Sequence, residues 1–298
     1  MSSIEISKED LQQLITGYSV EITPKAALKI ANFRDWLAED TEVYVPNLKN
    51  SKISDCVNTC ERLQSQGMQA VPHIIVRNYN SENELRQTLD VLVSFGIRRI
   101  LLLAGAASQP KGPYHSVMSL LKTGLLQDYP FNHIGFAGHP EGTKDIPKVE
   151  QEAAEAQKQG YALTYPHDYY FVTQFCFELP PIATWLAHLH ARHITLPVHI
   201  GIPGVASLQS LLRHAQACGI GSSMNFLWKN SRNIGKLMSL NTPDALLYNL
   251  AVYRKTHPQT IRQLHFYPLG GFETTINWLK SIADGRINLQ SKGFTVHD

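Results

Sequence analysis

The chain has 298 residues, of which 43% are hydrophobic and 17% charged, a composition typical of a folded protein with a sizeable core. Lysine and arginine total 27 against 25 acidic residues, and a net charge of +2 gives no basic surface for nucleic acid or an anionic membrane. The first residues lack the basic start and apolar block of a signal peptide, and no uninterrupted apolar run reaches the roughly 18 residues of a membrane span. We therefore expect a cytoplasmic protein.

Apolar runs of strand length recur along the chain with helical periodicity between them, which is the pattern of repeated βα units around a parallel sheet. The expected strands cover residues 18–22, 42–46, 70–76, 98–103, 133–137, 171–175, 197–202 and 263–267. Helices are expected at 26–37, 82–96, 148–160 and 207–219, the last two ending at Gly160 and Gly219. Eight such units predict an α/β fold, a (β/α)8 TIM barrel formed as a single domain over residues 1–298.

An extra helix is expected between the seventh and eighth strands. Thr242 has the residue type of an N-cap, Pro243 suits the first helical position, and Asp244 suits the first turn. After the eighth strand, residues 272–282 predict a last helix, and residues 287–298 follow as a tail.

No metal site is predicted. Cys56 and Cys60 are spaced C-x₃-C, which is not the spacing of a zinc knuckle, and the cysteines are too few for a disulfide framework. His188, His190 and His193 form a cluster, but on a helix only the last two share a face. We interpret them as residues of a surface helix.

The ends of the barrel strands are where such folds place their chemistry. Glu21 lies between Val20 and Ile22 near the end of the first strand, where partial desolvation raises a carboxyl pKa. A carboxyl that holds its proton near neutral pH suits a general acid. The alternative is a structural ion pair with an arginine or lysine on a neighbouring strand.

Two further strand ends carry polar candidates. Gln174 offers an amide that can donate and accept at once, as recognition of a heterocyclic amide edge requires, or else it is a core amide satisfied by the backbone. His139, in a loop with glycine and proline, is either a ligand-binding residue or a turn residue. The fourth strand, LLL, opens at Ala104 into small residues, which predicts room for a bound molecule.

Taken in order, these strand-end motifs resemble those of the methylenetetrahydrofolate reductase family. SVEITPK resembles the family's S-F-E-F-F-P-P, AVPHIIV resembles A-P-H-L-T, and FGIRRILLLAG resembles G-I-R-H-I-V-A-L-R-G-D. HIGFAGHPEG resembles I-S-V-A-A-Y-P-E, VTQFCFE resembles I-T-Q-F-F-F-D, and QLHFYPLG resembles F-H-F-Y-T-L-N. Six motifs in the right order on eight expected strands make the resemblance specific over nearly the whole chain.

The resemblance implies a barrel enzyme of one-carbon metabolism and methionine biosynthesis that reduces 5,10-methylenetetrahydrofolate to 5-methyltetrahydrofolate, with FAD as cofactor and NAD(P)H as co-substrate. It implies that Glu21 protonates the bridging nitrogen of the folate, which opens the five-membered ring to an iminium that accepts hydride. It implies that Gln174 hydrogen-bonds the pterin and that Gln209 and Tyr267 also bind substrate. The implied cofactor region comprises His73, Ala104, Gly105, Ala106, Tyr114, His139 and Lys158.

The sequence also departs from the family pattern. Where the family's fourth strand ends R-G-D, this chain has Ala104, Gly105 and Ala106, so the aspartate charge is lost. The family's histidine after Y-P-E-x is Thr143, and its arginine after the eighth strand is Gly271. Each lost contact weakens binding by about 1 to 3 kcal/mol, which predicts weak or absent FAD binding.

Without flavin, hydride must pass directly from the nicotinamide to the folate, with both bound together. Arg77, Asn78, Lys111 and Tyr114 are candidates to hold the nucleotide phosphate. Two alternatives remain open: a folate-dependent methyl or methylene transferase, and a non-catalytic folate-binding protein. We expect small-molecule folate and nicotinamide nucleotide as partners, and the sequence leaves homo-oligomerisation open.

Overall fold

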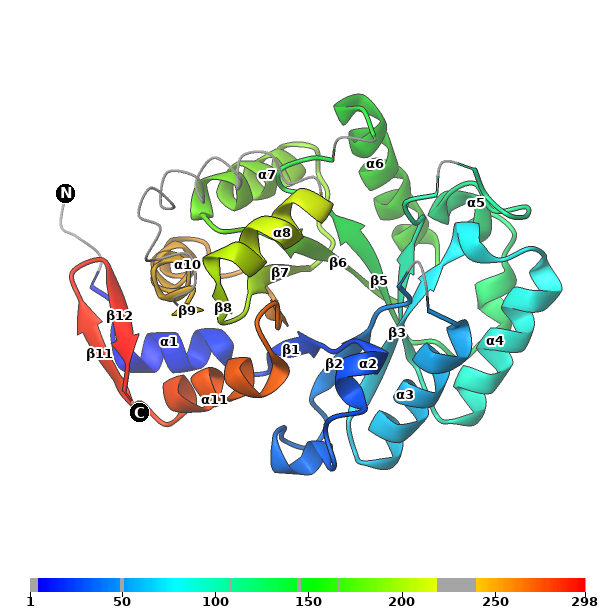
Figure 1. Ribbon diagram of the computed structural model, residues 1–298. Coiled ribbons are helices and arrows are strands. Elements are labelled where there is room, and N and C mark those ends of the chain that lie inside the picture. Colours follow the sequence, from blue (N-terminus) through cyan, green and yellow to red (C-terminus); the bar gives the residue numbers. More distant parts are fainter. Residues whose placement is uncertain are drawn as a thin grey trace. The chain divides into compact units, whose positions relative to one another are not determined.

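The computed structural model describes residues 5–48, 51–107, 109–143, 146–165, 167–218 and 240–297. Eight parallel strands close a barrel in the order β1-β10-β7-β6-β5-β4-β3-β2, with helices between them (Figure 1). The predicted α/β (β/α)8 TIM barrel is therefore confirmed. Contacts group the chain into two compact units: unit 1 is Met1–Ser19, Gly138–Lys148 and Val172–Asp298, and unit 2 is Val20–Ala137 and Val149–Phe171.

Unit 2 holds the strands from β1 to the first part of β6. The strands are β1 (Ser19–Glu21), β2 (Glu42–Val45), β3 (Gln69–Ile75), β4 (Arg99–Leu103), β5 (His133–Gly138) and β6 (Asp168–Phe175). The α-helices are α2 (Pro24–Ala27), α3 (Ile53–Ser65), α4 (Glu82–Ser94), α5 (Val117–Leu121) and α6 (Lys148–Thr164). Three 3₁₀ turns are η1 (Phe33–Asp35), η2 (Val76–Asn78) and η3 (Leu125–Asp128).

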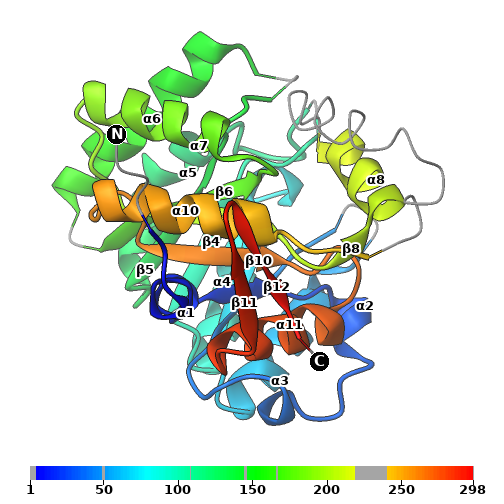
Figure 2. The ribbon, with the colours of Figure 1, turned by 90° about the vertical axis from the view of Figure 1, so that its left-hand side faces the viewer.

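Unit 1 holds the remaining elements of the barrel and its additions. The strands are β7 (Val198–Pro203), β8 (Ala206–Ser207), β9 (Leu240–Asn241), β10 (Gln263–Tyr267), β11 (Ile287–Gln290) and β12 (Gly293–Val296). The helices are α1 (Lys8–Ile15), α7 (Leu179–Ala191), α8 (Leu208–Cys218), α10 (Asp244–Thr256) and α11 (Phe272–Ala283). Helix α1 contacts α10 and α11, and the β11–β12 hairpin packs on α10 (Figure 2).

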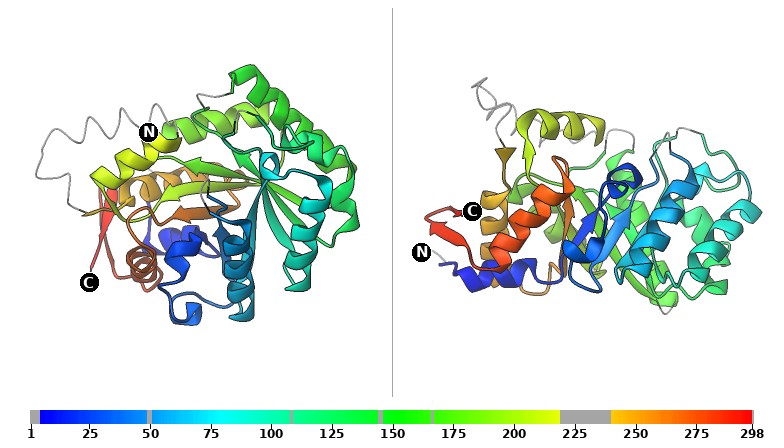
Figure 3. Two further views of the ribbon diagram at one scale, coloured as in Figure 1. Left: turned by 45° about the vertical axis from the view of Figure 1, so that its right-hand side comes forward. Right: turned by 60° about the horizontal axis from the view of Figure 1, so that its bottom comes forward.

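The alternation of the strands separates an apolar face from a polar one. The outer face carries the buried residues Val20, Val43 and Ala70 of strands β1, β2 and β3. Helix α3 packs against β2, β3 and α4 (Figure 3). Glu21 pairs with Tyr44 in the parallel register, so these two side chains lie on the opposite face of the strands, inside the barrel wall. This period of two places the candidate acid on the inner face.

Two expected helix boundaries are wrong. The predicted helix over 26–37 breaks into α2 and η1, because Asn32 is extended and caps the 3₁₀ turn through the Arg34 amide, while Arg62 donates to the carbonyls of Ala27, Ile30 and Ala31. Helix α6 continues past Gly160 to Thr164. Gly219 lies outside the described residues.

The additions around β10 differ in detail from the prediction. The extra helix α10 is confirmed but begins at Asp244, with Pro243 as its N-cap, one residue later than predicted. The Asp244 carboxylate accepts hydrogen bonds from the Thr242 hydroxyl and from Trp278 of α11 at 3.1 Å, which ties the helix start to its neighbour. The predicted tail forms the β11–β12 hairpin. No helix in the described ranges is long and apolar enough to cross a membrane.

Candidate functional site

Glu21 ends β1 at the inner face of unit 2. Its neighbour Ile22 donates its main-chain amide to the Tyr44 carbonyl at 2.9 Å, and Thr23 caps the short helix α2 that follows. The carboxyl is thus fixed between a paired strand and a capped helix. The side chain keeps 21% of its surface exposed, which leaves it accessible to a bound molecule.

The imidazole of His73, from β3, is the partner of this carboxyl. The distance between His73 Nε2 and Glu21 Oε2 is 3.7 Å. Burial raises the pKa of Glu21 to about 8 and lowers the pKa of His73 to about 3. Both groups are therefore neutral at pH 7, and the contact joins a protonated carboxyl to an uncharged imidazole. Glu21 forms no ion pair with arginine or lysine within the described ranges.

Two tyrosines fill the inner face of unit 2 next to this pair. The hydroxyls of Tyr44 and Tyr170 are 2.9 Å apart, and the Tyr44 ring lies edge-on to His73 with centroids 6.2 Å apart. Both tyrosines are almost fully buried. The Tyr44 ring thus places aromatic surface rather than water beside the His73 imidazole, and burial is what raises the pKa of Glu21.

Gln174 lies near the end of β6 in unit 1. Its side chain is half-buried, and its amide makes no hydrogen bond to any residue that the structure describes. The backbone-satisfied core amide that the sequence left open does not match this arrangement. Tyr267, at the end of β10, donates its hydroxyl to the Thr173 carbonyl at 2.8 Å, so the structure joins the two predicted substrate residues through one peptide unit.

Strands β6 and β7 approach unusually closely beside Gln174. A Cβ on Gly201 would lie 2.4 Å from the Thr173 carbonyl oxygen and 2.7 Å from that of Gln174, both of them backbone atoms that cannot rotate away. We expect Gly201→Ala to lower the free energy of unfolding by about 1 to 3 kcal/mol, as overpacking does. Urea denaturation measures this.

Gly160→Ala is the matched control for that substitution. Gly160 lies inside α6 and a Cβ there would meet nothing within 4 Å. Because alanine favours the helix, this variant should be up to about 1 kcal/mol more stable than the wild type. Equal stability of the two variants would contradict the close approach of β6 and β7.

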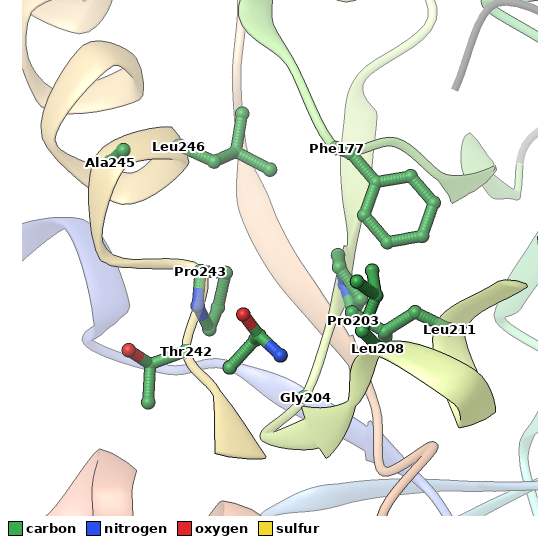
Figure 4. A pocket seen from close by; sticks show the side chains of 10 residues that line it. Phe177, Pro203, Gly204, Leu208, Leu211, Thr242, Pro243, Ala245 and Leu246 are labelled. Carbon is green, nitrogen blue, oxygen red and sulfur yellow. The ribbon is translucent and has the colours of Figure 1, made fainter. Parts of the chain in front are cut away.

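An apolar pocket of about 180 Å³ lies between the ends of β7, α8 and α10 in unit 1. Figure 4 shows Phe177, Leu208 and Leu211 on one side and Pro243 and Leu246 on the other. A cluster of buried residues that includes Phe175 and Phe177 joins this wall to Tyr267. Gln209, predicted to bind substrate, is exposed next to this wall.

The loop after β4 is held by Arg77. Its guanidinium donates to the carbonyls of His115 at 2.7 Å, Ala107 at 3.0 Å and Gly105 at 3.4 Å. Gly105 has a φ of +94°, and the Ile75 methyl lies 2.4 Å from where its Cβ would be. A Cβ at Gly105 would therefore overlap Ile75, while Ala106 is exposed, and room for a bound molecule at Ala104 to Ala106 stays a prediction.

The remaining predicted cofactor residues lie in different surroundings. The Lys158 ammonium lies over the rings of Phe136 and Phe171, 5.4 and 5.6 Å from their centroids, and burial lowers its pKa to about 8. Tyr114 is 2% exposed. His139 is half-buried in unit 1. In the described part of the chain, no group of three or more histidine, cysteine or acidic residues is arranged to hold a metal.

Sequence reasoning missed the residues that support the two candidates. Tyr44, Tyr170 and Thr173 lie within strands and not at the strand ends from which the candidates are drawn. The period of two offers a signal for the tyrosines, because each stands two residues after an acidic residue, Glu42 or Asp168, on the same face of its strand. No sequence signal marks Thr173.

The closed barrel of eight parallel strands with helices between them places this chain among the TIM-barrel proteins. A family model described as methylenetetrahydrofolate reductase matches residues 49–282. Because that match spans most of the sequence, the chain belongs to the methylenetetrahydrofolate reductase family.

One solved structure shares the fold at low sequence identity, and two others are less similar. An uncharacterized protein from Clostridium thermocellum that binds two copies of 5-methyl-5,6,7,8-tetrahydrofolic acid has a TM-score of 0.58 at 14% identity, covering 93% of this chain and 98% of that chain. Dihydropteroate synthase from Thermus thermophilus has a TM-score of 0.44 at 12% identity, covering 90% and 92%. A xylose isomerase domain containing protein from Salmonella typhimurium has a TM-score of 0.47 at 13% identity, covering 91% and 95%.

Proposed function

We propose that this protein reduces 5,10-methylenetetrahydrofolate to 5-methyltetrahydrofolate with NAD(P)H, using Glu21 as the general acid. The observation that carries the proposal is a largely buried carboxyl at the end of a barrel strand, 3.7 Å from the His73 imidazole, whose pKa is raised by burial to about 8. A merely structural carboxyl on the inner face would be expected to pair with a cation. Membership of the family supplies the reaction that such a proton would serve.

In the proposed reaction, Glu21 gives its proton to N10 of the folate as the N10–methylene bond breaks. The N5-iminium that remains accepts hydride from the reduced nicotinamide at the methylene carbon, which becomes the methyl group. The products are 5-methyltetrahydrofolate and oxidised nucleotide, and the Glu21 carboxylate then regains a proton from solvent. A general acid of this kind contributes about 10²- to 10⁴-fold to the rate.

Unit 1 carries its own candidate residues for binding a folate. Gln174 presents an amide that can donate to and accept from the amide edge of the pterin. The apolar pocket lined by Phe177, Leu208 and Leu211 suits a flat aromatic group such as the p-aminobenzoyl ring. That a solved barrel with a similar fold is described as binding a methylated tetrahydrofolate is consistent with a folate ligand.

The residues present do not fit a tightly held flavin, so we infer that hydride passes directly from the nicotinamide to the folate. A flavin diphosphate needs available cations, but Arg77 is engaged with loop carbonyls and Lys158 lies buried over two aromatic rings. The loop that carries the family's aspartate has Ala106 instead. Lys111 is exposed and remains a candidate for the nucleotide phosphate.

Steady-state kinetics tests direct transfer. A ternary complex gives double-reciprocal lines that intersect when folate is varied at several NAD(P)H concentrations, whereas a flavin shuttle gives parallel lines. We expect intersecting lines and a purified protein whose visible spectrum lacks flavin absorption. Parallel lines, with activity that depends on added FAD, would contradict the inference.

A non-redox folate-binding protein is the second candidate, favoured by the same missing charge at Ala106. Such a protein would bind 5-methyltetrahydrofolate but would not oxidise NAD(P)H in the presence of methylenetetrahydrofolate. Measuring both properties on one preparation distinguishes the two functions.

A further inference from the structure

We propose that Thr173 is a positioning residue that holds the main chain of β6 so that the Gln174 amide is presented to the folate. The proposal rests on the proposed folate-binding role of Gln174. Thr173 is fully buried, so its hydroxyl acts only on protein atoms. It donates to the Gln174 carbonyl at 2.8 Å and accepts from the Gly201 main-chain amide at 2.8 Å.

The Thr173 hydroxyl thereby replaces a main-chain carbonyl as the hydrogen-bond acceptor for the Gly201 amide. In a regular parallel ladder the Gly201 amide would donate to a backbone carbonyl of the neighbouring strand. Here the Gly201 amide donates to the Thr173 hydroxyl instead. The same hydroxyl donates to the Gln174 carbonyl. Residues 173 and 174 are thus fixed to β7 through one oxygen atom.

A third strand holds the same peptide unit. The Tyr267 hydroxyl, from β10, donates to the Thr173 carbonyl at 2.8 Å. Tyr267 is itself fixed, because its own carbonyl accepts from the main-chain amides of Gly204 and Leu269, both at 2.7 Å. Gly201 permits the close approach, since a Cβ there would overlap the Thr173 carbonyl.

All of these contacts fix the backbone, while none of them reaches the Gln174 amide. Within the described ranges that amide forms no hydrogen bond, so it is available to a ligand. A recognition group on a rigid backbone loses little conformational freedom when it binds, which improves affinity. Removing the Thr173 hydroxyl would leave the Gln174 carbonyl with only the weak donor Cys176 Sγ at 3.8 Å and the Gly201 amide without its acceptor, which would loosen the backbone that orients the Gln174 side chain.

Thr173→Val, which keeps the shape and removes the hydroxyl, tests this inference with Thr173→Ser as the conservative control. The readout is the dissociation constant of 5-methyltetrahydrofolate by titration calorimetry, measured beside Gln174→Ala and the double variant. We expect valine and Gln174→Ala each to weaken binding about tenfold, the double variant to be no weaker than Gln174→Ala, and serine to bind within about threefold of the wild type.

The outcomes distinguish a failure of the Thr173 inference from a failure of the proposed folate-binding role of Gln174. Wild-type affinity in Thr173→Val, or losses that multiply in the double variant, would show that Thr173 does not act through Gln174. Unchanged affinity in Gln174→Ala would instead overturn the proposed role of Gln174. If the valine variant does not fold, Thr173→Cys, whose thiol is a weaker donor and acceptor than the hydroxyl, replaces it in the same cycle with Gln174→Ala, and wild-type affinity in that variant would overturn the inference.

Discussion

Glu21→Gln should reduce kcat by about 10²- to 10⁴-fold while leaving the affinity for 5-methyltetrahydrofolate within about threefold of the wild type. Glutamine has nearly the shape of the protonated carboxyl but no proton that it can transfer. Because Glu21 is neutral in the folded protein at pH 7, the substitution changes little in the electrostatics of the resting site. The loss should therefore appear in turnover and not in binding.

Folate-dependent oxidation of NAD(P)H measures kcat, and calorimetric titration measures the affinity for 5-methyltetrahydrofolate. Glu61→Gln, at an exposed position of α3, makes the same chemical change away from the site and should leave both unchanged. In the wild type, kcat should be level below the Glu21 pKa and fall as the pH rises above about 8, because the acid is then ionised. A glutamine variant that retains more than a tenth of wild-type turnover would remove Glu21 from the chemistry.

The fold is predictable because its signals are local and repeated. Each strand of the barrel is a short apolar run bounded by turn residues, and the predicted bounds of β10 match the structure to the residue. The errors occur where tertiary contacts override periodicity, as when Arg62 holds the carbonyls of Ala27, Ile30 and Ala31 in a loop. The β11–β12 hairpin gains its stability from packing on α10, which no local pattern reports.

The candidate site is predictable from the sequence only where a single residue is unusual in its local context, as Glu21 is. A carboxylate placed in an apolar strand is recognisable from the sequence, and burial is the reason that its pKa is raised. The sequence could not show that the neighbour of Glu21 is the His73 imidazole, because that contact joins β1 and β3 across a strand. Nor could it show that Arg77 and Lys158 are engaged by carbonyls and aromatic rings.

A second expected result concerns stability. The raised pKa that suits Glu21 to proton donation also lowers the free energy of unfolding at neutral and higher pH. The unfolded chain has a Glu21 pKa of 4.5 and the folded protein one of about 8. Between these values the unfolded state releases a proton that the folded state keeps, so stability falls as the pH rises, by at most about 1.4 kcal/mol per pH unit. His73 acts oppositely: its pKa falls from 6.5 to about 3 on folding, so stability falls as the pH drops below 6.5.

Glu21→Gln removes the loss of stability that Glu21 causes as the pH rises, and it retains the loss that His73 causes as the pH falls. The variant should exceed the wild type in unfolding free energy by no more than about 1 kcal/mol near pH 5 and by a few kcal/mol at about pH 8, although its turnover is low. Urea denaturation at both pH values gives the difference, with Glu61→Gln as the variant whose stability relative to the wild type should not change between them. A constant gap between Glu21→Gln and the wild type would mean that Glu21 ionises alike in the folded and unfolded chain. The carboxyl would then not hold the proton that the proposed reaction requires.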